Sequence, residues 1–389
     1  MYMNTYLNDK ALELHQGAIR AMFDRAKNFP GSINLGIGEP DMDTPLEIVE
    51  EGCNALRQGK THYTANAGIV ELRRGISQYA LKQGLEVNPE NEIIVTTGGM
   101  GALALALMVT ISPGDEVLIQ DPQWLNYFSQ VKFFGGVPVP VPVWEDKGFR
   151  LSVEDIEKRI TNKSKILMIN SPNNPTGAVL EDEDLAAIAE LAKKHNLLVI
   201  SDEVYSTLLY DNMKHKSIMS ILDMKERTIV VNSFSKSFAM TGWRVGYGLG
   251  SEEIIDKMIR LQENIVACVT EASQYAALKA LSLFDRAEAM TEIYRERRDL
   301  IVSGLNSIEG ITCIKPKGSF YVFPNITGLG KDSFTAANEL LEKAGVITVP
   351  GSAFGQQGEG FLRISYANSM ENLKLALERI EKYTRQVLR

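Results

Sequence analysis

The sequence is poor in the residues that build disulfide frameworks and metal centres. It holds three cysteines, Cys53, Cys268 and Cys313, and four histidines among its 389 residues. An odd number of widely separated cysteines, without a Cys-x-x-Cys pair, argues against a disulfide scaffold and against a zinc site. We therefore expect no metal centre and a reducing, cytoplasmic environment.

Long apolar runs and basic segments are also missing. The most apolar run, residues 102–111, is far shorter than the roughly 20 residues that span a bilayer. The first residues lack a basic segment followed by an apolar core, so no signal peptide is expected. The net charge of −8 provides no basic field for nucleic acid. The sequence thus predicts neither a membrane nor a nucleic-acid partner.

The sequence is rich in short apolar runs, which alternate with amphipathic stretches between residues 90 and 250. The runs are Ile93–Val95, Val117–Ile119, Ile166–Ile169, Leu197–Ile200 and Thr228–Val231. Their β-branched, uniformly apolar character is typical of strands buried on both faces. Residues 181–195 carry apolar side chains at helical spacing, as expected of a helix between two such strands. This alternation predicts an α/β fold with a mostly parallel sheet between helices.

The pattern changes from about residue 280. A charged helical segment, residues 286–306, precedes short strand-like pieces and a final helix over residues 370–388. The strand-like pieces are Gly318–Phe323, Ile347–Val349 and Phe361–Ser365. We expect a large domain over residues 46–285 and a smaller α+β domain over residues 286–389. Residues 1–45 would form an N-terminal segment that joins the smaller domain.

Polar residues follow most of these apolar runs directly, so they fall just past the predicted strand ends. The polar segments that follow the five runs are residues 96–99, 120–124, 170–177, 201–205 and 232–236. Open α/β sheets bind ligands outside the carboxyl ends of their strands. Five separate segments could therefore meet at one crevice.

The glycine-rich residues 98–101 follow one strand and open a helix. Glycines let the backbone approach an anion, and a helix N-terminus offers free N–H groups. An ordinary strand-to-helix turn would look the same. Gly99-x-Gly101-x-x-Ala104, with Asp121 after the next strand, also matches a dinucleotide fingerprint, so a nicotinamide enzyme stays open. That alternative leaves the lysine, arginine and asparagine of the later motifs without a role.

Lys236 follows a buried strand, where a free charge is costly. An imine with an aldehyde removes the charge and makes a covalent catalyst. Ser233 and Arg244 can offer a hydroxyl and a guanidinium fork to a phosphate. Asp202, at another strand end, suits a pyridinium N–H, although a helix cap or a salt bridge would also explain it.

Seven segments together resemble one family. They are Gly36–Asp41, Tyr63–Gly68, Gly98–Gly101, Asn170–Gly177, Asp202–Tyr205, Ser233–Lys236 and Phe361–Ser365. In this order, and over nearly the whole chain, they resemble the class I/II pyridoxal-phosphate (PLP) aminotransferases of fold type I, the aspartate aminotransferase superfamily. A single segment is unspecific, whereas seven in order are highly specific.

The resemblance implies a catalytic set of Lys236, Asp202 and Tyr205. Lys236 would hold PLP as a Schiff base, the internal aldimine, and later move the substrate Cα proton. Asp202 would pair with the pyridine nitrogen, while Asn174 and Tyr205 would contact the phenolate oxygen. The implied reaction moves an amino group from an L-amino acid to a 2-oxo acid, with 2-oxoglutarate as the expected acceptor. A PLP lyase that catalyses β-elimination on the same scaffold is the alternative.

The resemblance also implies where the rest of the cofactor is held. Gly99, Met100, Ser233 and Arg244 would bind the phosphate, and Trp124 would stack on the ring. A lysine occupies the position of Met100 in some aspartate-using relatives. Because Met offers only a soft apolar surface, an aromatic, alanine-like or broad substrate range is expected as readily as aspartate.

The implied substrate contacts come from three distant parts of the chain. Arg363 would clamp the α-carboxylate with its planar fork, together with Gly38 and Asn174. Tyr63 would reach the phosphate of a neighbouring subunit, which implies a homodimer with shared active sites. Phe320 and Tyr321 could line the side-chain pocket or simply pack in a strand.

Overall fold

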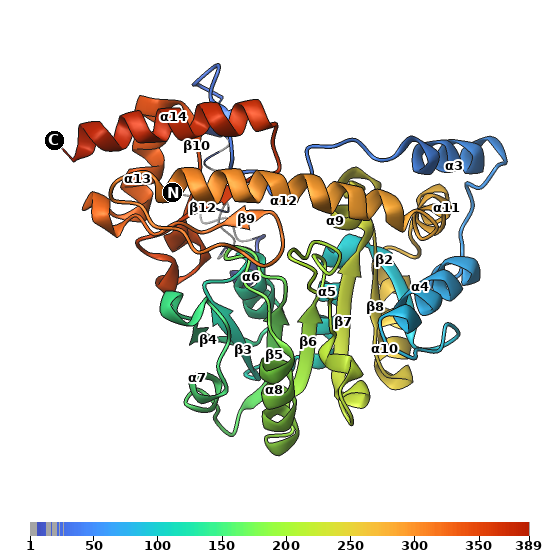
Figure 1. Cartoon of the computed structure of the whole chain (residues 1–389). Coiled ribbons are helices and arrows are strands. Elements are labelled where there is room, and N and C mark those ends of the chain that lie inside the picture. Colours follow the sequence, from blue (N-terminus) through green and yellow to red (C-terminus); the bar gives the residue numbers. More distant parts are fainter. Residues whose placement is uncertain (1–5, 13–16, 18–21, 23, 26, 389) are drawn as a thin grey trace.

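A computed structural model of the chain describes residues 6–12, 17, 22, 24, 25 and 27–388 (Figure 1). The helices are α1 (Asp9–Leu12), α3 (Leu46–Arg57), α4 (Val70–Lys82), α5 (Gly98–Thr110), α6 (Asn126–Phe133), α7 (Val153–Glu157), α8 (Asp182–Lys194), α9 (Phe234–Ser237), α10 (Glu252–Ile265), α11 (Glu271–Ala280), α12 (Phe284–Asn306), α13 (Ser333–Glu339) and α14 (Met370–Val387). The strands are β1 (Ile33–Asn34), β2 (Ile93–Thr97), β3 (Glu116–Asp121), β4 (Val137–Pro142), β5 (Ser164–Asn170), β6 (Leu198–Asp202), β7 (Thr228–Ser233), β8 (Val245–Leu249), β9 (Tyr321–Val322), β10 (Val346–Ile347), β11 (Val349–Pro350) and β12 (Leu362–Ser365).

A seven-stranded sheet forms the centre of the described chain. Its strand order is β2-β8-β7-β6-β5-β3-β4. Strands β7, β6, β5, β3 and β4 are parallel, and β8 runs antiparallel to both of its neighbours. The predicted α/β fold with a mostly parallel sheet is confirmed.

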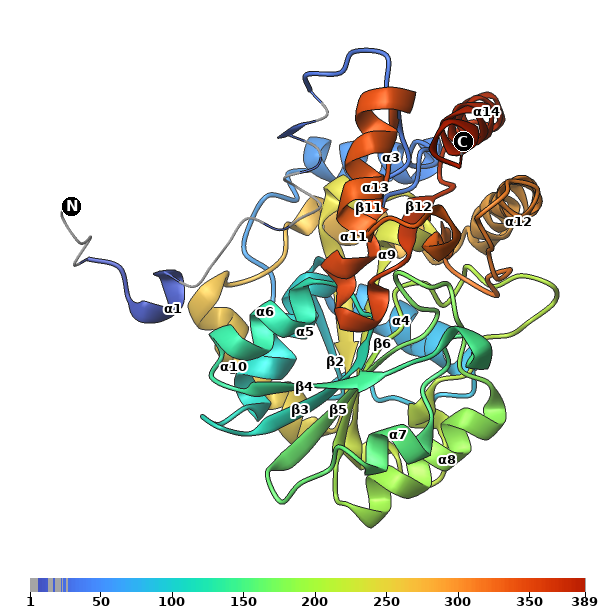
Figure 2. The ribbon, with the colours of Figure 1, turned by 90° about the vertical axis from the view of Figure 1, so that its left-hand side faces the viewer.

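Helices cover both faces of this sheet, which explains why its strands are apolar throughout. In β5, Ile166 and Met168 pack into the apolar cluster that includes residues of α5 and α10. Leu167 and Ile169, at the alternate positions, pack against α8. Figure 2 shows the two helical layers, with α5 and α10 on one side of the strands and α7 and α8 on the other. The period of two therefore buries both faces of β5 over residues 166–170.

Two strands of the sheet were not among the predicted runs. The edge strand β4 alternates valine and proline and pairs only with β3 in this sheet. Proline lacks an N–H to donate and suits an edge. Strand β8 contains Gly246, where an added Cβ would lie 2.4 Å from the carbonyl carbon of Gly98. A side chain at this position would separate β8 from the start of α5.

A second, smaller sheet is formed by the C-terminal part of the chain. Its order is β11-β12-β9, with antiparallel pairs. The expected single strand over residues 347–349 is wrong, because β10 and β11 are separate. Strand β10 instead pairs with β1, so residues 33–34 of the N-terminal segment lie beside residues 346–347. An apolar cluster joins these strands to α12, α13 and α14. The exact domain boundaries stay a prediction.

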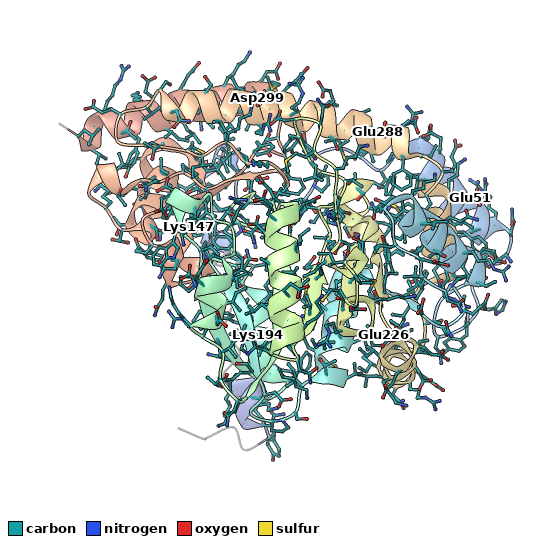
Figure 3. The ribbon with its side chains drawn as sticks, turned by 60° about the horizontal axis from the view of Figure 1, so that its bottom comes forward. Glu51, Lys147, Lys194, Glu226, Glu288 and Asp299 are labelled. Carbon is teal, nitrogen blue, oxygen red and sulfur yellow. The ribbon has the colours of Figure 1, made fainter. Side chains whose placement is uncertain are left out.

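Charged side chains lie on the outside of the molecule. Lys147, Lys194 and Glu226, labelled in Figure 3, are examples that are exposed. Within the described part of the chain, none of the helices combines the length and apolar character that a membrane span requires.

Candidate active site

A cavity of about 540 Å³ opens where the carboxyl ends of the central strands meet the smaller sheet. It brings together residues that are far apart in the sequence. Those singled out from the sequence are Gly38, Gly99, Met100, Trp124, Asn174, Asp202, Tyr205, Ser233, Lys236, Arg244 and Arg363. Tyr63 does not line it and is 89% exposed. Except for Tyr63, all residues to which the resemblance gave a catalytic, cofactor-binding or carboxylate-binding role therefore share one cavity.

The glycine loop and Arg244 form one end of the cavity. Gly98 has a φ of +68°, and an added Cβ would lie 2.6 Å from Nη2 of Arg244. The Arg244 guanidinium thus lies directly against the backbone that starts α5. Ser233 caps α9 by accepting a hydrogen bond from the Ser235 N–H. Helix N–H groups, a hydroxyl and a guanidinium are the donors that bind a phosphate.

Lys236 lies on α9, directly after β7. Its Nζ donates a hydrogen bond to the carbonyl oxygen of Gly38, from the N-terminal segment. Burial lowers the pKa of Lys236 to about 8, against the attraction of Glu39. A larger fraction of the amine is therefore uncharged and nucleophilic near neutral pH than in an exposed lysine.

Asp202 ends β6 and is 4% exposed. Its Oδ2 accepts a hydrogen bond from the Tyr127 hydroxyl at 2.6 Å, and its Oδ1 accepts one from the Val204 N–H at 3.2 Å. Burial raises the pKa of Asp202 to about 6, while these two donors and Lys236 act in the opposite direction. The carboxylate is thus held by one donor on each oxygen at the wall of the cavity.

Arg363, on β12, is buried at 2% exposure between two aromatic rings. Its guanidinium carbon lies 4.6 Å from the ring centroid of Tyr321 and 4.9 Å from that of Phe354. Nη1 donates to Oδ1 of Asn174 at 3.1 Å, and Nη2 donates to the Gly36 carbonyl. Nε has no partner among the described residues. A buried, flat guanidinium with a free donor suits a planar anion such as a carboxylate.

Two tyrosines complete the wall near Arg363. The hydroxyls of Tyr205 and Tyr321 lie 3.0 Å apart, and burial raises the pKa of both phenols. Tyr321 lies so close to Gly38 that a Cβ there would be 2.4 Å from its hydroxyl oxygen. Of the two aromatic residues that the sequence left open, Tyr321 lines the cavity and Phe320 does not, although both pack in the same apolar cluster.

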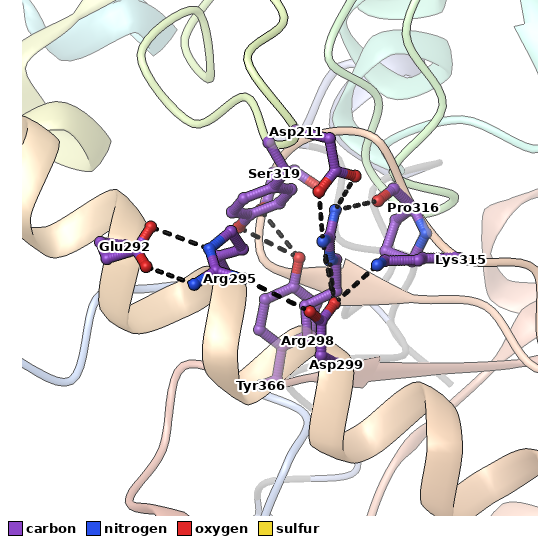
Figure 4. Close-up of polar contacts among 10 residues, drawn as sticks. Asp211, Glu292, Arg295, Arg298, Asp299, Lys315, Pro316, Ser319 and Tyr366 are labelled. Carbon is purple, nitrogen blue, oxygen red and sulfur yellow. Dashed lines mark hydrogen bonds and ion pairs between the residues drawn. The ribbon is translucent and has the colours of Figure 1, made fainter.

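An ion-pair network on α12 supports the segments that carry these tyrosines (Figure 4). The fully buried Arg298 donates to both carboxylate oxygens of Asp211, at 2.8 and 2.9 Å, and to the Pro316 carbonyl at 3.2 Å. Asp211 follows Tyr205 in the chain, and Pro316 precedes Tyr321. Arg298 therefore ties both segments to the same helix.

Met100 is enclosed by amide side chains of α6. Its sulfur accepts weak hydrogen bonds from Asn126 Nδ2 at 3.8 Å and Gln130 Nε2 at 3.7 Å. Neither amide carries a charge, so this wall offers an apolar thioether backed by neutral donors.

Sequence reasoning missed several lining residues, among them Ile37, Glu39, Tyr127 and Asn170. Asn170 belongs to a quoted motif, and its Oδ1 accepts a hydrogen bond from the Asn174 N–H at 2.9 Å. Tyr127 lies one helical turn after Trp124, and this spacing was the available signal. Ile37 and Glu39 flank Gly38 in the quoted motif Gly36–Asp41, and this adjacency was the available signal.

Asp121, the acidic residue of the dinucleotide fingerprint, has other partners. Its carboxylate accepts hydrogen bonds from the backbone N–H groups of Gln356 and Gln357, at 3.1 and 3.3 Å. It thus fixes the loop after β11 to the end of β3 and is not directed at a ribose.

The sequence matches the family "Aminotransferase class I and II" over residues 30–380. It is 44% identical over 384 residues to aromatic-amino-acid aminotransferase 2 of Thermococcus litoralis, and 45% identical over 384 residues to an aspartate aminotransferase of Pyrococcus abyssi. Both alignments cover 98% of each chain.

Solved structures agree with this assignment. The aromatic aminotransferase of Pyrococcus horikoshii has a TM-score of 0.90 at 45% identity, covering 94% of this chain and 99% of that one. The aspartate aminotransferase of Thermus thermophilus with maleate has a TM-score of 0.91 at 39% identity, covering 97% and 99%. The chain belongs to the class I and II aminotransferase family. This family membership excludes the alternative of a nicotinamide enzyme.

Proposed function

We propose that the enzyme transfers an amino group from an L-amino acid to 2-oxoglutarate, using PLP bound at Lys236. One observation carries the proposal: the amine of Lys236 and the carboxylate of Asp202 line the same cavity in a chain of this family. An amine at the aldehyde and a carboxylate at the ring nitrogen are two contacts by which proteins hold this cofactor and tune its ring.

The chemical groups that line the cavity match those of the cofactor. It has a glycine-lined anion end with Arg244 and Ser233, a lysine whose pKa burial lowers, and a buried carboxylate. Gly99, Met100, Ser233 and Arg244 would hold the phosphate, and Trp124 would stack on the ring. Bound PLP supplies a protonated aromatic ring that withdraws electrons from the substrate Cα.

The chain's own residues would supply orientation and proton transfer. Lys236 would hold the cofactor and, once released by the substrate amine, accept the Cα proton at Nζ as an uncharged base. Asp202 would keep the ring nitrogen protonated. Asn174 and Tyr205 would donate to the phenolate oxygen. Nothing in the cavity or the comparisons favours elimination over transfer.

Arg363 would bind the α-carboxylate that all substrates share. Its free Nε and its position between two aromatic rings support this role. Asn174 and the backbone of Gly38 would lie beside the same carboxylate. Desolvated guanidinium–carboxylate pairs are strong and directional, so this contact would orient Cα for proton removal.

The preferred donor depends on the wall around Met100. Without a cation at this position, an aromatic or broad range is favoured over strict use of aspartate. Relatives named for aromatic amino acids and for aspartate have similar identity to this chain, at 44% and 45%. The identity values alone do not favour either donor. We propose an aromatic or broad range because the wall around Met100 carries no charge.

We further propose a homodimer in which Tyr63 completes the partner's phosphate site. Its side chain is 89% exposed and lies outside its own chain's cavity. The resemblance of Tyr63–Gly68 to a segment of the family supports this contact. The cytoplasmic location stays a prediction.

A donor panel assayed with 2-oxoglutarate tests the function. We expect glutamate formation with aromatic donors at kcat/KM equal to or above that with aspartate. The matched variant Met100→Lys should shift this ratio toward aspartate by ~10-fold, because it adds a charge for the distal carboxylate. Pyruvate and ammonia as the main products from serine or cysteine would instead show a lyase.

A further inference from the structure

Tyr127 lies in the active site without a role in the proposed function. Its hydroxyl donates to Oδ2 of Asp202 at 2.6 Å, and its side chain is 1% exposed. Both residues line the cavity. A buried phenol that donates at this distance to a carboxylate makes a charge-assisted hydrogen bond, which is stronger than a neutral one.

We propose that Tyr127 is a positioning residue that holds the Asp202 carboxylate ionised and oriented toward the ring nitrogen of bound PLP. The inference rests on the proposed pairing of Asp202 with that nitrogen. Tyr127 would act through Asp202.

The charges around Asp202 explain why a neutral donor is needed. Burial disfavours the ionised form, and the neighbouring Glu203 acts in the same direction. Lys236 favours ionisation, but its amine would be engaged by the cofactor aldehyde. Tyr205 also faces this region, as a phenol whose pKa burial raises. The support from Tyr127 would persist when the cofactor is bound.

The Glu203 carboxylate cannot replace Asp202, because its own partners lie elsewhere. It accepts hydrogen bonds from Ser201 at 2.8 Å and Ser217 at 2.6 Å, and it lies 2.7 Å from Nε2 of His215. Within the described residues, the Asp202 carboxylate therefore accepts hydrogen bonds from the Tyr127 hydroxyl and the Val204 N–H.

Tyr127 also couples Asp202 to the ring-stacking residue. Its ring meets Trp124 edge to face, with centroids 5.4 Å apart and planes at 85°. Its N–H donates to the Trp124 carbonyl at 3.1 Å. Trp124 lies just before α6 and Tyr127 lies in its first turn. This turn of the chain fixes the relative positions of the two side chains.

The test compares PLP with an analogue in which a carbon replaces the ring nitrogen. Dissociation constants of both are measured for the apoenzyme of the wild type, Tyr127→Phe and Tyr366→Phe. The control Tyr366→Phe also removes a buried hydroxyl, one bonded to Tyr210 and the Ser319 carbonyl. We expect the wild type to prefer PLP, and Tyr127→Phe to lose ~10-fold or more of that preference. Tyr366→Phe should keep it.

The ratio of the two constants separates positioning from a merely structural role. If Tyr127→Phe leaves the ratio unchanged, whether or not it weakens both ligands, the role of Tyr127 is overturned but the proposed pairing of Asp202 is not. A wild type without preference would overturn the proposed Asp202 pairing and the inference together. Tyr127→His, which keeps an N–H donor on a shorter side chain, should restore part of the ratio, and it provides a second variant if Tyr127→Phe does not fold.

Discussion

The two walls of the cavity handle charge in different ways. The wall from the seven-stranded sheet carries Asp202 and Lys236, and burial shifts both pKa values toward neutrality, to about 6 and about 8. The wall from the smaller sheet carries Arg363, which stays a cation because its pKa begins so high, although burial lowers it. The first wall is suited to proton transfer and the second to binding a fixed anion.

The comparison also separates how each wall is built. Asp202 and Ser233 end the neighbouring parallel strands β6 and β7, and Lys236 follows β7, so one topological rule gathers them. Arg363 meets Asn174 and Gly36 across 189 and 327 residues of sequence. The sheet wall is set by local order along the chain, and the other wall by docking of distant segments.

The largest expected effect lies on the sheet wall. Lys236→Ala should lower kcat by at least ~10⁴-fold for every donor, because it removes both the covalent attachment and the base. Steady-state assays across the donor panel measure this loss. Lys194→Ala, at an exposed lysine paired with Glu157, is the control and should keep full activity. Near-normal turnover of Lys236→Ala would contradict the assignment.

On the opposite wall, Arg363→Ala should reduce kcat/KM by ~10²- to 10³-fold for all amino donors and for 2-oxoglutarate. All of these substrates carry the carboxylate that Arg363 would bind. The affinity for PLP should stay within ~3-fold, because the loss is confined to the substrate. If only one donor were affected, Arg363 would instead select a side chain. Arg385→Ala, at an exposed position, serves as the control.

A smaller change tests the contact between the N-terminal segment and Tyr321. In Gly38→Ala the new Cβ would lie 2.4 Å from the Tyr321 hydroxyl, so that ring must move. We expect kcat/KM to fall ~10-fold, as for an overpacked site. In the matched variant Gly36→Ala the nearest atom is at 3.4 Å, an ordinary contact. Equal effects of the two substitutions would show that Tyr321 is not held in place by Gly38.

The smallest effect is a shift along the pH axis. The uncharged amine of Lys236 is the reactive form, and burial lowers its pKa from 10.5 to about 8. The rate at which the apoenzyme fixes PLP should therefore rise with pH and level off above a midpoint near 8. Stopped-flow absorbance between pH 6 and 10 measures it. A midpoint near 10 would show that Lys236 is solvated like an exposed lysine.

Most of the sheet wall could be predicted from the sequence. The apolar runs located five of the seven central strands, and the polar residues after them gave Asn174, Asp202, Ser233 and Lys236. Strand β4 was missed because its valine–proline alternation lacks a continuous apolar run. Residues 347–349 were expected to form one strand, but the chain divides there between two sheets.

The roles of the remaining site residues could be assigned only from the family resemblance or from the structure. Arg363 was found only because Phe361–Ser365 resembles a known segment, since an arginine in a short strand is locally unremarkable. Tyr127 belongs to none of the seven motifs, and Glu39 lies within Gly36–Asp41 but was given no role from the sequence. Their importance depends on the contact of Tyr127 with Asp202 and on the proximity of Glu39 to Lys236, which the motifs do not express.

The sequence by itself determined the α/β class and the row of polar strand ends, because buried parallel strands require apolar runs and ligand groups collect where those runs stop. It also determined the family, through seven motifs in order. Only the tertiary structure decided which buried groups touch: the Tyr127 hydroxyl on Asp202, and Arg363 between Tyr321 and Phe354. Burial and pairing set the pKa of each group, and both arise only when distant segments pack together.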